Sequence, residues 1–215
     1  MPAIVATKAE IRASHRAARS ALSRARLESA GEGIAVHGLG WAAALAGGNP
    51  DTFAAYVGVG AEPPTLPLLT ALHAAGHRIL LPVCEPGLVL SWVYWTPTTE
   101  FVRSRYAPIQ EPAGERLDTS VMLQTRGIFL PATAVDLSGN RIGQGGGYYD
   151  KFLAALAGLV PSRPQTTGGG VLPPLPTAAV VYDAEVLPAG TIPAEPFDRK
   201  VASALTPGGL FRLHS

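Results

Sequence analysis

The residues best suited to chemistry lie in one glycine-rich segment, residues 136–150, with the sequence DLSGNRIGQGGGYYD. Its four glycines at 143, 145, 146 and 147 lack a Cβ, so the backbone can adopt positive φ and approach a ligand closely. The amide groups of such a loop, just before a helix, can bind an anion such as a phosphate. Arg141 adds a planar cation suited to phosphate oxygens, and Asp150 adds a carboxylate suited to a divalent metal ion.

The glycine pattern by itself leaves two interpretations open. It is not G-x-x-x-x-G-K-[ST], because no Lys-Ser/Thr pair follows the glycines. It is not G-x-G-x-x-G either, because Tyr148 takes the place of the last glycine. One interpretation is a general anion-binding loop, and the other is a flexible glycine turn before a helix.

Basic residues are concentrated near the N-terminus of the chain. Lys8, Arg12, Arg16 and Arg19 recur at spacings of three and four residues, which places them on one face of a helix. For most of them we expect a solvated helix face. The alternative is that the start of this helix delivers a cation to a phosphate.

Several segments together resemble one family. The segment GNRIGQGGGYYDKFL is similar to the signature G-x-R-L-G-x-G-x-G-Y-Y-D-x-x-L of the 5-formyltetrahydrofolate cyclo-ligases, also called 5,10-methenyltetrahydrofolate synthetases. Weaker matches follow the family's order over roughly residues 8–208: KAEIR at 8–12, Glu62, LP at 81–82, IQEP at 109–112, IPAEPFD at 192–198 and Thr206.

The resemblance implies a fold and a reaction. The fold is a three-layer α/β sandwich with a central, largely parallel sheet and a glycine-rich phosphate loop. The reaction is the ATP-dependent cyclisation of 5-formyltetrahydrofolate to 5,10-methenyltetrahydrofolate, with release of ADP and phosphate. ATP phosphorylates the formyl oxygen and N10 attacks the activated carbon. Such a protein needs phosphate clamps, Mg²⁺ and close positioning of two reactants, and no covalent nucleophile.

The resemblance also implies roles for individual residues. The ATP-binding positions are Lys8, Arg12, Arg141, Ile142, Gly143, Gln144, Gly145, Gly146, Gly147, Tyr148 and Tyr149. The folate-binding positions are Val57, Glu62, Tyr106 and Tyr148. The implied metal ligands are Asp150 and Asp198, and the implied catalytic residues are Arg141 and Tyr148.

The sequence departs from the family pattern at several positions. Gln144 and Gly146 stand where the family often has Tyr or Arg and Lys, and Phe197 and Ala202 replace a His and a second Asp. These departures keep a rival interpretation open, a folate- or nucleotide-binding family member without cyclo-ligase activity. A third interpretation is a phosphate-binding α/β domain for sugar phosphates or coenzyme A.

The elements expected around these residues alternate between helices and strands, as in an α/β domain. Helices are expected over residues 7 to about 29, 30–46, 63–75 and 148–159, and strands over 52–57, 78–83, 88–95, 127–130 and 178–182. Residues 161–177 are expected to form a loop. The first helix has a capping-box start at Thr7 and Glu10 and an apolar stripe made of Ile11, His15, Ala18, Leu22 and Ala25.

Other polar residues are expected to be structural. Asp136 either supports the glycine loop or holds the turn before Ser138 and Gly139. Asp183 and Glu185 are expected at a strand end or on the surface.

Composition limits the classes of function. A chain of 215 residues that is 47% hydrophobic can bury one sizeable core, which favours one domain and allows two. With the family resemblance, we expect a single cyclo-ligase-like α/β domain over residues 1–215. A net charge of +1 creates no field that attracts nucleic acid or a membrane, and no apolar run reaches the roughly 18 residues of a membrane helix. Cys84 is the single cysteine, which excludes an internal disulfide. We expect a cytoplasmic monomer or weak homodimer whose ligands are ATP, Mg²⁺ and 5-formyltetrahydrofolate.

Overall fold

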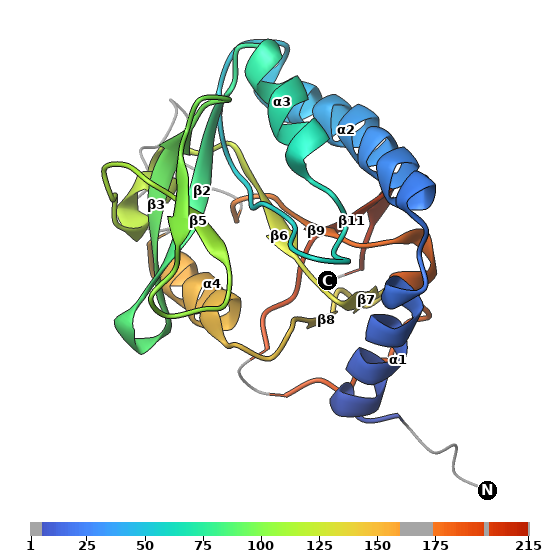
Figure 1. Ribbon diagram of the computed structural model, residues 1–215. Coiled ribbons are helices and arrows are strands. Elements are labelled where there is room, and N and C mark those ends of the chain that lie inside the picture. Colours follow the sequence, from blue (N-terminus) through green and yellow to red (C-terminus); the bar gives the residue numbers. More distant parts are fainter. Residues whose placement is uncertain (1–5, 160–173, 196–197, 215) are drawn as a thin grey trace, which may run out of the picture.

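A computed structural model describes residues 6–159, 174–195 and 198–214, and its centre is a seven-stranded sheet of order β12-β11-β9-β6-β1-β2-β3 (Figure 1). Five neighbouring strands run parallel: β11 (Ser203–Thr206), β9 (Thr177–Val180), β6 (Gly127–Pro131), β1 (Thr52–Ala54) and β2 (Arg78–Glu85). The edge strands β3 (Val89–Trp95) and β12 (Gly209–Arg212) are antiparallel to their neighbours. The prediction of a largely parallel central sheet is therefore confirmed.

Helices cover both faces of this sheet (Figure 1). On one face, α2 (Arg24–Ala46) and α3 (Leu66–Ala74) bury Ile34, Trp41 and Leu68 against Phe53 and Phe129 of the sheet. On the other face, α4 (Tyr148–Leu159) and the 3₁₀ helix η2 (Thr119–Gln124) pack against the sheet in a second core. Because strands buried on both faces need mostly apolar residues, β6 reads as an apolar run, and β1 adds Phe53 and Ala54 after the buried Thr52. The three-layer α/β prediction is confirmed.

Two small sheets flank the central one. The first joins β7 (Ala134–Asp136), β8 (Arg141–Ile142) and β10 (Val186–Leu187), and helix α1 (Lys8–Ser20) lies beside β7 and β8 (Figure 1). The second joins β4 (Phe101–Arg103) and β5 (Gln110–Pro112) as a hairpin. The short 3₁₀ helices η1 (Pro86–Leu88) and η4 (Asp183–Glu185) connect strands.

The prediction of one helix from residue 7 to about 29 is wrong. The helix ends at Ser20, and α2 begins at Arg24 after a break in which Ser23 acts as the N-cap, its hydroxyl accepting from the amide of Arg26 at 3.3 Å. A serine that caps a new helix is hard to tell by sequence from a serine inside a helix. The capping box at Thr7 and Glu10 is confirmed.

The expected apolar stripe of this helix is also wrong in large part. Of its members only Ile11 is buried, whereas His15 and Leu22 are half-buried and Ala18 and Ala25 are exposed. The second buried residue of α1 is Arg19, which the sequence placed on the solvated basic face.

Two carboxylates whose burial the sequence left open or placed at the surface are buried. Glu185 is 3% exposed, which contradicts the expectation of a surface carboxylate. Asp136 is fully buried and accepts from the amides of Ser138, Asn140 and Ile192 at 3.0, 3.0 and 3.1 Å. It therefore holds its own turn and also fixes the start of the segment that leads to Asp198. Asp183, by contrast, is exposed as expected; it lies in η4 and accepts from the hydroxyl of Thr206.

The remaining expected elements agree with the structure to within a few residues, namely the helices at 63–75 and 148–159 and the hairpin of β2 and β3. Most of the expected loop 161–177 lies outside the described residues. No helix in the described ranges has the length and apolar character needed to cross a lipid bilayer.

Candidate active site

A cavity of about 380 Å³ lies where the chain turns away from the carboxyl ends of β1 and β6. These two strands are neighbours, and the chain proceeds from β1 toward β2 on one side and returns to β6 on the other. Such a point, where the strand order reverses, leaves a crevice that α/β proteins use for ligands. Residues from the segments after both strands line this cavity, among them Tyr56, Glu62 and Ala132.

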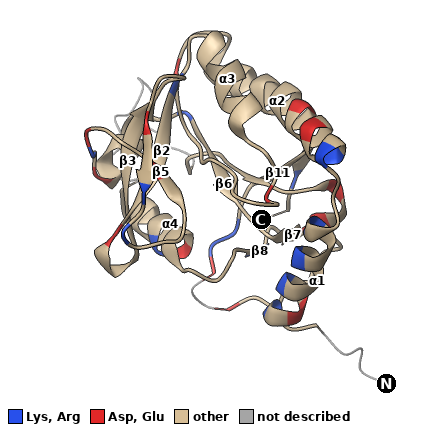
Figure 2. Ribbon diagram, in the orientation of Figure 1, with Lys and Arg blue, Asp and Glu red and all other residues tan. Residues whose placement is uncertain are grey.

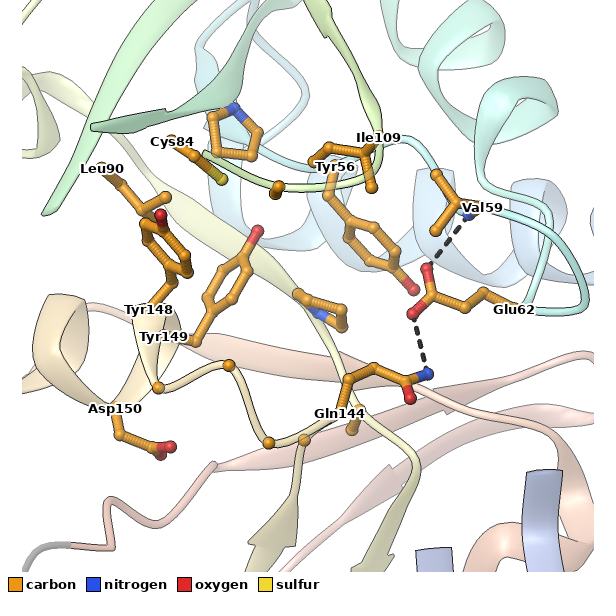
Figure 3. Close-up of a pocket in the computed structure, with 18 of the residues that line it drawn as sticks. Tyr56, Val59, Glu62, Cys84, Leu90, Ile109, Gln144, Tyr148, Tyr149 and Asp150 are labelled. Atoms are coloured by element: carbon orange, nitrogen blue, oxygen red, sulfur yellow. Dashed lines mark hydrogen bonds between the residues drawn. The ribbon is translucent and has the colours of Figure 1, made fainter. Parts of the chain in front are cut away.

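One part of the cavity is apolar. Its walls come from the β2–β3 hairpin, which contributes Pro82, Cys84 and Leu90, and from the β4–β5 hairpin, which contributes Ile109 and Pro112. Figure 3 shows Tyr148 and Tyr149 projecting from the start of α4 toward these walls, while Asp150 points away from the rings. The arrangement suits a flat, mostly apolar ligand with polar groups at its edge.

The other part of the cavity is polar and is built around the glycine loop, residues 143–147. Gly145 and Gly147 have φ values of +99° and +77°, which side chains other than glycine rarely adopt. A Cβ at position 143 would lie 2.9 Å from Nη1 of Arg141, so the loop passes directly over this guanidinium. The positive φ expected of the glycines occurs at Gly145 and Gly147, whereas binding of an anion by the loop stays a prediction.

Lys8 extends from the first turn of α1 into the polar part of the cavity. Its Nζ lies 2.6 Å from Oδ2 of Asp198 and 2.9 Å from Oε2 of Glu195. The amide of Glu195 also donates to Oδ2 of Asp198 at 2.7 Å, so Glu195 and Asp198 lie together against the start of α1. The structure thus brings together an expected phosphate ligand and an expected metal ligand.

Arg141 and Asp150 form a second ion pair beside the first. Arg141 is buried on β8, donates to the half-exposed carboxylate of Asp150, and also approaches the carbonyl of Pro131 at 3.4 Å. Its Nε is buried and has no hydrogen-bond partner within the described residues. A buried donor without a partner is costly, and a ligand that supplied an acceptor would satisfy it.

A chain of hydrogen bonds connects α1 with the far side of the cavity. Nε of Arg12 donates to the carbonyl of Gly143 at 2.8 Å, and Nε2 of Gln144 donates to Glu62 at 3.1 Å. The second carboxylate oxygen of Glu62 accepts from the amide of Val59 at 3.1 Å (Figure 3). Gln144, which stands where the family pattern often has Tyr or Arg, therefore links the glycine loop to an expected folate-binding carboxylate.

Two buried hydroxyls face the cavity without a partner. The hydroxyl oxygens of Tyr56 and Tyr149 are buried and accept or donate no hydrogen bond to any residue that the structure describes. Burial raises the pKa of both hydroxyls above the ordinary value, and the nearby Glu62 adds to the effect, so both stay protonated. Each of these two hydroxyls can therefore donate a hydrogen bond to a bound ligand or accept one from it.

Cys84 and Tyr148 also stay protonated near neutral pH. Burial and the neighbouring Glu111 raise the pKa of the Cys84 thiol to about 12, which excludes a reactive thiolate. Burial and the adjacent Cys84 thiol raise the pKa of the Tyr148 hydroxyl. Glu111 is buried and accepts from the amide of Cys84 at 2.7 Å, so it ties the second hairpin to the first.

The structure gathers nearly all of the residues expected at the site around this one cavity. Its lining includes Lys8, Arg12, Val57, Glu62, Arg141, Gly143, Gln144, Gly145, Gly146, Gly147, Tyr148, Tyr149, Asp150 and Asp198. Two expected residues are not among the lining residues described. The Ile142 side chain is buried with Ile11 in a separate small core, and the Tyr106 side chain is exposed.

Sequence reasoning missed several lining residues. Tyr56 directly precedes the expected residue Val57, but an aromatic residue after a buried strand looks like part of the core. Glu195 lies inside the IPAEPFD segment without a role of its own. The only signal for it was the presence of a second carboxylate three residues before Asp198.

The carboxylates of Asp150 and Asp198 could bind a divalent metal ion only if a bound ligand supplied further oxygen atoms. No cluster of three or more His, Cys, Asp or Glu side chains in the described residues could hold a metal by itself. Asp150 and Asp198 supply hard oxygen ligands beside three cations. Mg²⁺ is typically bound by one or two carboxylates and completes its coordination with phosphate oxygens and water, so this donor set fits it.

The fold and the cavity define the class of protein, an α/β protein with a ligand site at the switch point of a mainly parallel sheet and a glycine loop at the start of a helix. Residues 4–207 match the 5-formyltetrahydrofolate cyclo-ligase family. The chain belongs to this enzyme family, and the expected family resemblance is confirmed.

Individual relatives agree with this assignment. The chain is 36% identical over 164 residues to the 5-formyltetrahydrofolate cyclo-ligase of Mycolicibacterium smegmatis. The aligned region covers 73% of each chain. It is 34% identical over 104 residues to the 5-formyltetrahydrofolate cyclo-ligase of Escherichia coli K12, which covers 47% of this chain and 57% of that one.

Two solved structures share the fold. The 5,10-methenyltetrahydrofolate synthetase of Aquifex aeolicus superposes with a TM-score of 0.68 at 23% identity and covers 97% of this chain and 93% of its own. That of Mycoplasma pneumoniae gives a TM-score of 0.65 at 16% identity, over 93% and 98% of the two chains.

Proposed function

We propose that this protein cyclises 5-formyltetrahydrofolate to 5,10-methenyltetrahydrofolate at the expense of ATP, with ADP and phosphate as the other products. The observation that carries the proposal is that one cavity combines an aromatic-lined apolar part with a glycine loop flanked by Lys8, Arg12 and Arg141. A reaction between a flat heterocycle and a nucleoside triphosphate needs an apolar and a phosphate-binding part of the cavity side by side.

On the polar side, the triphosphate would lie along the glycine loop. Amide groups of residues 143–147 at the start of α4 and the cations Lys8, Arg12 and Arg141 would bind its oxygens. Two of these cations are paired with carboxylates, Lys8 with Asp198 and Arg141 with Asp150. ATP binding would therefore exchange a carboxylate partner for a phosphate partner at each of them.

The exchange releases the carboxylates for a metal ion. Asp150 and Asp198 would hold Mg²⁺, which when bound neutralises charge on the phosphate oxygens. Because the same carboxylates hold Arg141 and Lys8 before ATP arrives, they keep these two cations extended into the cavity.

On the apolar side, the pterin ring would lie between the hairpin walls and the tyrosines of the loop. Val57 lines this part, and the half-buried Glu62 presents a carboxylate at its edge. The unpartnered hydroxyls of Tyr56 and Tyr149 would meet polar groups of the ring. We assign the backbone of Tyr149 to the phosphate loop and its hydroxyl to the folate, and Tyr106 to the outer end of the folate.

The chemistry then requires little of the protein beyond positioning. The formyl oxygen attacks the terminal phosphorus of ATP and ADP departs, so that a poor leaving group becomes a phosphate ester. N10 attacks the formyl carbon, the carbon–oxygen bond breaks, the oxygen leaves with the phosphate, and N10 loses its proton. Arg141 would stabilise charge on the phosphoryl group in transfer, and Tyr148 would donate a hydrogen bond to the formyl group.

We further propose that the protein works in the cytoplasm on small-molecule ligands only, as a monomer or weak homodimer. A single buried cysteine and a net charge of +1 support a reducing compartment and the absence of a polyanionic partner.

An omission experiment tests the proposal. Purified protein is mixed with 5-formyltetrahydrofolate, ATP and MgCl₂, and the near-ultraviolet absorbance of the methenyl product is followed. Product should form only when all three are present. Turnover without ATP, or no turnover by well-folded protein that still binds folate, would instead favour a binding protein of the same family.

A further inference from the structure

Helix α1 carries two of the proposed phosphate ligands but has little apolar attachment to the rest of the protein. All 13 residues of α1 are described, and only Ile11 and Arg19 among them are buried. Ile11 packs in a small core with Ala134, Ile142 and Ile192. Besides the hydrogen bond from Arg12 to Gly143, the helix body has a buried polar attachment, which is located at the opposite end from Lys8.

Arg19 makes this attachment through a buried bidentate ion pair. Its Nε and Nη2 lie 2.6 and 2.8 Å from the two carboxylate oxygens of Glu185, and the two residues are 4% and 3% exposed. The amide of Tyr182 donates to the same carboxylate at 2.8 Å, which fixes Glu185 in the turn that precedes β10. The planar fork of an arginine matches a carboxylate in this geometry, and a lysine cannot reproduce it.

The guanidinium of Arg19 also contacts the segment after β6, which lines the cavity. Nη2 of Arg19 donates to the carbonyl of Ala132 at 2.8 Å, and Nη1 of Arg141 approaches the preceding carbonyl, that of Pro131, at 3.4 Å. Pro131 and Ala132 both line the cavity. Two arginines thus bind consecutive carbonyls of one segment, one from α1 and one from β8, which leads into the glycine loop.

The spacing of the basic residues along α1 relates the ion pair of Arg19 to the cavity. Lys8, Arg12 and Arg19 are separated by four and seven residues, which places them on the same side of the helix (Figure 2 shows the basic residues of α1). A rigid helix held at Arg19 therefore fixes the direction in which Lys8 and Arg12 point. Buried ion pairs contribute little to stability compared with apolar residues of similar size, which favours a positional role for this one.

We propose that the Arg19–Glu185 pair is the positioning device that sets α1, and with it Lys8 and Arg12, against the glycine loop for ATP binding. This inference rests on the proposed function, because it names the residues that prepare its nucleotide site. Arg19 and Glu185 are positioning residues, since neither lines the cavity.

Three variants distinguish a positioning role of the Arg19–Glu185 pair from a contribution of the pair to protein stability. Arg19→Met removes the pair, Arg19→Lys keeps the charge and loses the fork, and Arg19→Met combined with Glu185→Leu replaces the pair by apolar side chains. The double variant should regain thermal stability relative to Arg19→Met, because no unpaired carboxylate remains buried. The control is Arg24→Met, which breaks the exposed pair between Arg24 and Glu28 on α2.

ATP and 5-formyltetrahydrofolate are titrated separately into each variant that is folded at the assay temperature, and KM is measured for both. We expect ATP affinity to fall at least ~10-fold in all three variants, because small misplacements of binding groups cost up to about 100-fold. Folate affinity should change less than about 2-fold, and the Arg24→Met protein should match wild type.

Wild-type ATP affinity in any folded variant of the three would overturn the inference, as would an equal loss for ATP and folate. A wild-type protein that binds no ATP would contradict the proposed function itself. The two failures are therefore distinguishable.

Discussion

Lys8 and Asp198 stand 190 residues apart in the chain, yet Nζ of Lys8 lies 2.6 Å from Oδ2 of Asp198 at the edge of the cavity. The first turn of the first helix and the C-terminal segment thus form one corner of the proposed nucleotide site. The proposed function assigns Lys8 to phosphate and Asp198 to the metal ion, so ATP and Mg²⁺ would separate this pair.

The first prediction concerns Lys8→Ala. A charge-assisted hydrogen bond contributes roughly 1.5–3 kcal/mol, so ATP affinity should fall about 10- to 100-fold while folate affinity stays nearly unchanged. Calorimetric titration of each ligand measures both. Arg24→Ala, at an exposed cation of α2, is the matched control. Unchanged ATP affinity in Lys8→Ala would show that the start of α1 is only structural.

The second prediction concerns Asp150→Asn. If Asp150 holds the metal, turnover should fall at least ~10-fold, a cost of about 1.4 kcal/mol, and more Mg²⁺ should be required. The Asn variant also frees Arg141 from its ion pair, so metal-free ATP should bind at least as tightly as to the wild type. Asp198→Asn should raise the Mg²⁺ requirement in the same way.

Titration of ATP with and without MgCl₂ distinguishes this account from a purely supporting role for Asp150. A loss of ATP affinity that is equal in both conditions would mean that Asp150 only orients Arg141. Wild-type kinetics in both variants would remove Asp150 and Asp198 from the metal site.

The third prediction concerns the unpartnered hydroxyls of Tyr56 and Tyr149. Removing either as Tyr→Phe breaks no hydrogen bond to the described residues, so the melting temperature should stay the same or rise. Folate affinity should fall about 2- to 10-fold, the contribution of a neutral hydrogen bond. Tyr94→Phe is the control, because Tyr94 lies on β3 against Arg78 and does not line the cavity. Folate binding that is unaffected by both variants would argue against this role.

The fourth prediction compares two neighbouring glycines. Gly145 has a φ of +99°, so Gly145→Ala strains the loop even though its nearest neighbour would lie 4.0 Å away. Gly146 has no such φ and its added Cβ would meet only Tyr148 at 3.8 Å, which makes Gly146→Ala the control. Left-handed backbone costs a non-glycine residue about 1–2 kcal/mol, so ATP affinity should fall roughly 5- to 30-fold in Gly145→Ala alone. Equal behaviour of the two variants would show that the loop shape does not matter for ATP.

Local sequence signals predicted the parts of the fold that depend on neighbouring residues. The glycine loop and α4 are adjacent in sequence, and alternating apolar runs and turns located the β2–β3 hairpin. The break between α1 and α2 was not predicted, because Ser23 is preceded and followed by good helix formers. The alternation of helices and strands indicated an α/β domain, and the family resemblance implied its three layers.

The contacts that cross the chain could not be predicted in the same way. Arg19 and Glu185 are 166 residues apart, and each alone looks like a surface charge, since buried charges are rare unless they are paired. The pairing of Lys8 with Asp198 was missed for the same reason, although both residues were expected at the site. Sequence motifs predicted which residues lie at the cavity, but not the ion pairs and hydrogen bonds that these residues form with one another.

The central claim is that the formyl oxygen receives the terminal phosphoryl group of ATP, and an isotope experiment tests it most directly. 5-Formyltetrahydrofolate labelled with ¹⁸O in the formyl group is converted by the wild-type protein with unlabelled ATP and Mg²⁺, and the released phosphate is analysed by mass spectrometry. The account predicts one ¹⁸O atom in each phosphate released with methenyl product. Unlabelled phosphate, with the ¹⁸O recovered in water, would contradict it.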